Sequence, residues 1–242
     1  MFDHLIHELG SALENNQRII PSFKNALAKA RVTMASNFEA GVSTDLLIKA
    51  NSDFMDDIMR LAWNRFKWTE NRTSWRKSRI SLLAVGGYGR QELLPNSDID
   101  LLILLERNNQ SAHRDNIQSF TTLLWDIGLE VGHSVRSIAE CKPSALHDVT
   151  ILTAMMESRT ILGDGALCKK VQQKIAPGRS WSAKSFYLAK RQEQNGRHEK
   201  SNHTEYSLEP NVKTSPGGLR DIQTLTWVAR RRYGTQNITE LA

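Results

Sequence analysis

The stretch VGGYGRQELLPNSDIDLLIL, which occupies residues 85–104, decides how this chain is interpreted. An apolar segment leads into a pair of glycines, and a second apolar segment begins within the run Asp-Ile-Asp. Short apolar runs bounded by glycine and other turn residues are typical of buried strands. Two aspartates at positions i and i+2, here Asp98 and Asp100, point to the same face of a strand. The stretch therefore predicts a strand, a glycine-rich turn and a second strand that opens with two carboxylates.

This combination suits a nucleoside triphosphate together with divalent metal. Backbone N–H groups of a glycine-rich turn can hold phosphates, and Mg²⁺ prefers carboxylates together with substrate phosphates. Two metal ions can stabilise the attacking and leaving oxygens of an in-line displacement. A bare Asp-x-Asp is more often an incidental turn, but here the glycine pair, the Ser-Asp-x-Asp run and the apolar strand occur together. The sequence thus predicts nucleotidyl transfer.

Two other phosphate-binding motifs are absent from the sequence. A dinucleotide-binding fingerprint would need a further glycine at the position where Glu92 stands. No Gly-Lys-Ser or Gly-Lys-Thr is present, so the glycines do not form a Walker loop.

The bulk properties of the chain agree with a globular enzyme but do not identify one. It has 242 residues, 40% of them hydrophobic, and a formal net charge of +6. A basic surface suits polyanions such as triphosphates, nucleic acid or an acidic protein, and it is equally compatible with a role in solubility alone. Two cysteines without a Cys-x-x-Cys spacing predict neither a disulfide framework nor a zinc site. The first residues do not resemble a signal peptide, and no apolar run is long enough to span a membrane, so we expect a cytoplasmic protein.

We expect an α+β fold: a small mixed sheet flanked by helices and followed by a helical domain. No strand is expected beyond residue 144. The predicted helices are residues 1–40, 44–66, 113–127, 144–157, 166–175, 183–200 and 219–233, and the predicted strands are residues 80–85, 99–105 and 129–135.

Three regions follow from these elements. Residues 1–79 form an N-terminal helical region, residues 80–140 the core with the glycines and aspartates, and residues 141–242 a helical domain. The chain ends without a natural closing element, and we therefore expect this last domain to be truncated at its C-terminal end.

At this point a family resemblance is clear. Residues 85–104 resemble the active-site signature of the DNA polymerase β-like nucleotidyltransferases. Three further motifs are similar to the bacterial PII uridylyltransferase/uridylyl-removing enzymes: WDIGLEVGHSVR at 125–136, EQNGRH at 193–198 and LEPNVKTSPGGLRD at 208–221. The first motif gives only the superfamily, and the three later ones make the assignment specific.

The resemblance implies roles for particular residues. Gly86, Gly87 and Ser97 would contact the nucleotide. Asp98 and Asp100 would hold Mg²⁺ or Mn²⁺ and serve as catalytic residues.

Lys213 and Arg220, on the Pro-Gly-Gly motif, are also assigned to nucleotide binding. For both, a solvated basic helix face remains the alternative.

The third carboxylate that the superfamily usually adds is less certain. We select Glu130, because it opens a predicted strand and faces away from Leu129 and Val131. A solvated glutamate at a strand edge is an equally good interpretation. Asp126, at a helix end, and Glu106, beyond the second strand, are poorer candidates.

The resemblance implies transfer of UMP from UTP to a tyrosine of the PII signalling protein, with release of pyrophosphate. Alternatives are adenylyl transfer to a protein such as glutamine synthetase, and a non-catalytic nucleotide-binding regulatory module. No nucleic-acid partner is expected, since no RNA-binding motif is present.

The family's uridylyl-removing HD domain and glutamine-sensing ACT domains are expected to lie outside this chain. The dipeptide His147-Asp148 is interpreted as a coincidence, because it lacks the additional ligands of an HD hydrolase.

Overall fold

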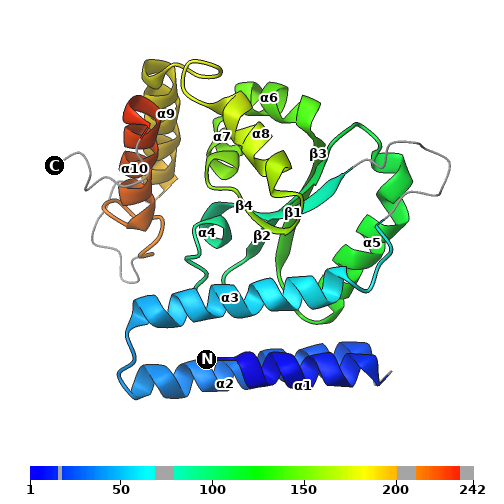
Figure 1. Ribbon diagram of the computed structural model, residues 1–242. Helices are drawn as coiled ribbons and strands as arrows, with labels where there is room; N and C mark the ends of the chain where they lie inside the picture. The colour runs from blue at the N-terminus through cyan, green and yellow to red at the C-terminus, as the bar shows by residue number, and fades with distance from the viewer. Residues whose placement is uncertain (16–17, 69–78, 201–210, 235–242) are drawn as a thin grey trace. The chain divides into compact units, whose positions relative to one another are not determined.

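The computed structural model describes residues 1–15, 18–68, 79–200 and 211–234 (Figure 1). The chain divides into two compact units, each described here by itself. The first unit comprises residues 1–141 and 157–171, and the second comprises residues 142–156 and 172–242.

A four-stranded sheet forms the centre of the first unit. Its strands are β1 (Ile80–Ala84), β2 (Ile99–Leu105), β3 (Val131–Ser137) and β4 (Arg159–Gly163), in the spatial order β3-β2-β1-β4. Strand β1 pairs in antiparallel fashion with both β2 and β4, whereas β2 and β3 are parallel. The prediction of a small mixed sheet flanked by helices is confirmed.

The expectation that no strand follows residue 144 is wrong, because β4 completes the sheet. Its residues pair with β1, Leu162 opposite Leu82 and Thr160 opposite Leu83, with an irregularity between these pairs. Within β4 only Ile161 is fully buried. A five-residue segment with polar ends carries little strand signal of its own, so its conformation comes from pairing with β1.

Helices α1 (Asp3–Glu14), α2 (Ile19–Glu39), α3 (Thr44–Trp63) and α5 (Gln110–Asp126) complete most of the first unit. Helix α3 lies between the sheet and the pair α1 and α2 (Figure 1). One face of the sheet, which includes Leu101 and Ile103, joins Ile58, Met59 and Phe120 in a continuous hydrophobic core. Burial of this face fixes the strand register, because a shift by one residue would turn it to solvent.

The second unit is helical in its described part. It contains α7 (Val149–Met156), α9 (Ala183–Lys200) and α10 (Leu219–Tyr233). The second unit also includes the C-terminal ends of α6 (Ile138–His147) and α8 (Gly165–Ile175), two helices that begin in the first unit.

Helices α9 and α10 lie side by side in this unit (Figure 1). The buried guanidinium of Arg231 on α10 donates to the carbonyl oxygens of Ile175 and Trp181. None of the helices within the described ranges combines the length and the apolar character that a membrane crossing requires.

Candidate active site

The predicted glycine-rich turn is a single turn of helix, α4 (Gly86–Gly89). Gly86 has φ +60°, a left-handed conformation that favours glycine. The turn is closed by hydrogen bonds from Gly89 N to Val85 O (3.1 Å) and from Arg90 N to Gly86 O (3.1 Å). The first N–H groups of a helical turn have no acceptor within it. Those of Gly86 and Gly87 can therefore donate to a phosphate.

Asp100 lies between this turn and strand β3. Its backbone carbonyl accepts a hydrogen bond from Val85 N (3.0 Å), which ties β2 to the start of the turn. Its register partner on β3 is Gly132. A Cβ atom at Gly132 would lie 2.8 Å from Oδ1 of Asp100, and one at Gly86 would lie 3.2 Å from Oδ2. The two glycines thus leave the space that the carboxylate occupies.

Asp98 comes directly before β2 and, like Asp100, is exposed. It follows a loop in which Asn96 takes a left-handed conformation (φ +61°) and Ser97 N donates to Leu94 O (3.1 Å). Asparagine tolerates this conformation better than most residues. Ser97 also lines a largely apolar pocket of about 570 Å³ beside the site.

Glu130 is exposed and immediately precedes β3, and it lines the same pocket as Ser97. Its backbone carbonyl accepts a hydrogen bond from Ile99 N (2.8 Å). Across the described part of the chain, no three histidine, cysteine, aspartate or glutamate side chains are grouped so that they could hold a metal ion. Glu130 is therefore not gathered with Asp98 and Asp100 into a three-carboxylate cluster, and its catalytic role stays a prediction.

The two poorer candidates for a third carboxylate lie elsewhere. Asp126 is the last residue of α5 and is exposed. Glu106 forms an ion pair with Arg79 (2.6 Å), and this hydrogen bond lowers the pKa of Glu106 to about 2. A carboxylate held by an arginine in this way is less available to a metal.

Asp98 and Asp100 suit a hard divalent cation. They offer exposed anionic oxygen atoms at the beginning of one strand, next to the amides of a turn that can hold phosphate. Mg²⁺ is commonly held by one or two carboxylates that are completed by substrate phosphates and water. Two carboxylates beside a phosphate-binding turn are therefore a sufficient protein ligand set for such an ion.

Sequence reasoning missed Gly132, although a glycine inside a strand pattern often marks a close approach. It also missed the partners of the turn's own side chains. Tyr88 and Arg90 contact acidic groups that are distant in sequence, Asp56 and Glu157. Only the folded chain brings these residues together.

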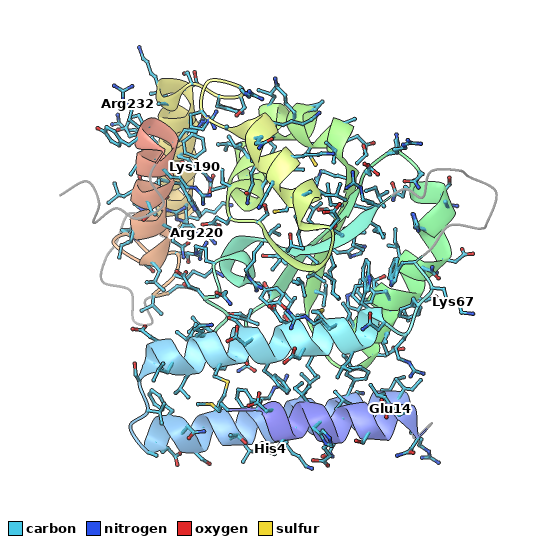
Figure 2. All side chains as sticks on the ribbon, viewed as in Figure 1. His4, Glu14, Lys67, Lys190, Arg220 and Arg232 are labelled. Carbon is cyan, nitrogen blue, oxygen red and sulfur yellow. The ribbon has the colours of Figure 1, made fainter. Side chains whose placement is uncertain are left out.

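Lys213 and Arg220 belong to the second unit. Lys213 is exposed, and its carbonyl accepts a hydrogen bond from Arg220 N (2.9 Å). Figure 2 labels Arg220 on α10 and Lys190 on α9. Both lie over the ring of Trp227, at 5.5 and 4.5 Å from its centroid. Residues 208–210 of their motif lie outside the described residues. The assignment of Lys213 and Arg220 to nucleotide binding stays a prediction.

In the dipeptide His147-Asp148, His147 ends α6 and Asp148 lies between α6 and α7. Oδ1 of Asp148 accepts a hydrogen bond from the backbone N of Thr150 (2.7 Å). Hydrogen bonds from the side chain and then from the backbone of Thr150 lower the pKa of Asp148. Such a bond satisfies an amide in the first turn of α7, as a helix cap does. Capping accounts for Asp148 without any metal.

Comparison with known proteins agrees with this geometry. Residues 67–156 match the family described as a nucleotidyltransferase domain. The chain therefore contains a nucleotidyltransferase domain, the class of protein with which its fold agrees.

The particular relatives follow from the rest of the chain. Residues 185–242 match the family described as GlnD PII-uridylyltransferase. Over 90% of its length, the chain is 52% identical to a bifunctional uridylyltransferase/uridylyl-removing enzyme of Azotobacter vinelandii. It is likewise 52% identical over 92% of its length to the enzyme of that name from Pseudomonas fluorescens. The chain is thus a relative of these enzymes, and it spans about a quarter (24%) of the length of each.

Proposed function

We propose that this chain transfers UMP from UTP to a tyrosine hydroxyl of a PII signalling protein and releases pyrophosphate. The observation that carries the proposal is the position of Asp100, between the phosphate-binding turn at Gly86 and Gly132 on the neighbouring strand. The uridylyl group and the PII partner are taken from the names of the related proteins.

Each part of the site has a separate task in this reaction. The amides of Gly86 and Gly87 hold the triphosphate, with Ser97 close by, and this fixes the α-phosphorus for attack. Asp98 and Asp100 hold Mg²⁺ or Mn²⁺, which supplies positive charge against the attacking and leaving oxygens. We assign Glu130 a catalytic role from a position outside a three-carboxylate cluster. Lys213 and Arg220, which belong to the second unit, are assigned to nucleotide binding. The reaction takes place in the cytoplasm.

The names of the related proteins indicate that the transferred nucleotide is uridylyl, whereas the geometry of the site does not distinguish UTP from ATP. The turn and the two aspartates contact phosphates and metal, which are the same in UTP and ATP. Adenylyl transfer to another protein is therefore the competing function. The nucleotide that the chain uses, UTP or ATP, distinguishes the two functions.

The test is incubation of the 242-residue chain with purified PII protein, Mg²⁺ and either UTP or ATP, followed by mass spectrometry of PII. We expect a uridylyl adduct on a tyrosine peptide with UTP and none with ATP. The double variant Asp98→Asn/Asp100→Asn is the matched control and should give no adduct. An adduct formed only with ATP, or one that persists in the double variant, contradicts the proposal.

A further inference from the structure

The nucleotide-binding turn has one buried side chain that reaches away from its glycines. Tyr88 is 1% exposed, and its hydroxyl donates a hydrogen bond to Oδ1 of Asp56 (2.7 Å). Asp56 lies on α3 and is itself only 4% exposed. A carboxylate is rarely buried to this degree unless it is paired. The turn is thus attached to the helical layer through a buried acidic group.

Arg159, the first residue of β4, completes this attachment. Its Nη1 lies 2.5 Å from Oδ2 of Asp56 and its Nη2 lies 3.0 Å from Oδ1, a two-pronged contact. The same Nη2 lies 3.4 Å from the backbone oxygen of Tyr88, and the guanidinium lies 5.5 Å from the centre of the Tyr88 ring. One arginine therefore contacts both the acidic group and the backbone of the turn.

A second ion pair holds Arg90, the residue that follows the turn. Nη1 of Arg90 pairs with Oε1 of Glu157 (2.7 Å), whose side chain is 4% exposed. A Cβ atom at Gly89 would overlap the backbone oxygen of Glu157. Glu157 and Arg159 therefore hold the turn through Tyr88 and through Arg90, which follows the turn, while the amides of Gly86 and Gly87 stay available to phosphate.

A buried ion pair is a weak source of stability, because the cost of removing the charges from water offsets much of their attraction. Stability alone therefore gives little reason for this cluster. A better reason is that the turn must present its amides to a phosphate in a fixed orientation. Preorganised donors avoid reorganisation during binding and reaction.

We propose that Asp56, Tyr88 and Arg159 are positioning residues for nucleotide binding, which hold α4 so that Gly86 and Gly87 face the triphosphate. The inference rests on the proposed function, because it requires that the turn binds a nucleotide. It assigns these residues no contact with the reacting atoms.

The test is the variant Tyr88→Phe, which removes the hydroxyl but keeps the ring and the Asp56–Arg159 pair. Loss of a buried hydrogen bond to a carboxylate should weaken binding of Mg²⁺–UTP about 5- to 10-fold. We expect this as a rise in the UTP dissociation constant by calorimetry and in the KM for UTP. The KM for PII should stay within about twofold and kcat within about threefold, because the acceptor and the metal site are not altered.

Tyr187→Phe on α9 is the matched control, since Tyr187 is exposed and should give wild-type values. Asp56→Asn should weaken UTP binding further than Tyr88→Phe. In the double variant the two effects should fall well short of additive, because both changes weaken the Tyr88–Asp56 hydrogen bond. Asp45→Asn, an exposed change on the same helix, serves as its control.

Three outcomes are informative. If Tyr88→Phe lowers the melting temperature but binds Mg²⁺–UTP as tightly as the wild type, the cluster is only structural and the inference is wrong. If the wild-type chain binds UTP but modifies no PII, the proposed transfer fails while the binding comparison still tests the cluster. If the wild-type chain binds no nucleotide, both proposals fail.

Discussion

Asp221 in the second unit and the pair Asp98 and Asp100 in the first unit differ in what surrounds their carboxylates. In the second unit, three protein groups contact the carboxylate of Asp221. Arg197 forms an ion pair with it, His198 Nε2 lies 3.0 Å away, and Gly217 N donates a hydrogen bond of 2.9 Å. In the first unit Asp98 and Asp100 are exposed, and Gly86 and Gly132 lie next to the carboxylate of Asp100.

The difference is between an aspartate that holds the fold and two aspartates that we propose hold a ligand. Asp221 ties the start of α10 to α9 and to the turn at Gly217. A carboxylate used in this way has few remaining positions for a metal ion. Asp98 and Asp100 are exposed, so a metal and a phosphate can reach them from the solvent. Substitution should therefore damage stability in one case and catalysis in the other.

The largest expected effect is on catalysis. Asp98→Asn and Asp100→Asn should each lower kcat by at least ~10³-fold, because a neutral amide does not anchor a metal that contributes several kcal/mol to the transition state. Pyrophosphate release measures the rate, and thermal unfolding should show little change for these exposed positions. Asp126→Asn, another exposed change, is the control. Near wild-type release with an unchanged metal requirement would remove these aspartates from the site.

The second expected effect concerns Glu130. If it completes the metal site, Glu130→Gln should lower kcat by roughly 10²-fold with a much smaller change in the KM for UTP, since the lost contact acts in the transition state. Steady-state kinetics at saturating Mg²⁺ separates the two constants. An almost silent Glu130→Gln would mean that two carboxylates suffice.

A third effect should come from Gly132→Ala. The new Cβ would press on Oδ1 of Asp100, and the exposed carboxylate would move aside. Activity should fall by about 10-fold, roughly the effect of a 1.4 kcal/mol loss, and more Mg²⁺ should be needed. The unfolding midpoint should hardly change, as in Gly165→Ala, where the Cβ meets no atom within 4 Å. Unchanged metal dependence would show that the close approach has no role.

Asp221→Asn should have the smallest effect on the rate of nucleotidyl transfer. It should have a clear effect on stability. It should lower the free energy of unfolding by about 1–3 kcal/mol, because Arg197 and His198 lose a charged acceptor. Burial alone would raise the pKa of Asp221, but the hydrogen bonds from Gly217, Gln194 and Arg197 together lower it. Its contribution is therefore complete above the ordinary aspartate pKa and disappears as the pH falls through the lowered value.

Denaturant unfolding between pH 2 and pH 7 measures this contribution. The wild type should lose stability on acidification more steeply than the variant. Equal slopes would show that Asp221 is not held by its donors.

The glycine turn, the two aspartates and the final helix could be predicted because each has a local signal. Residues Leu219 to Tyr233 form the helix that their pattern indicates. Strand β4 and the contacts of Arg159 could not be predicted, since a residue that pairs with Asp56 across 103 positions leaves no local pattern. The close approach of Gly132 to Asp100 depends on the β2–β3 register, which only the parallel pairing fixes.

The late position of β4 in the sequence has a consequence for biosynthesis. Strand β1 is an inner strand of the finished sheet, yet on that side its neighbour is β4, which ends at Gly163. At ~5–20 residues per second, a ribosome needs roughly 4 to 16 seconds to extend the chain from β1 to the end of β4. Throughout this interval one side of an apolar strand is an open edge, the kind of surface on which unrelated chains aggregate. A chain shortened to residue 140 would keep that edge permanently, so it should express as insoluble material even though both aspartates are present.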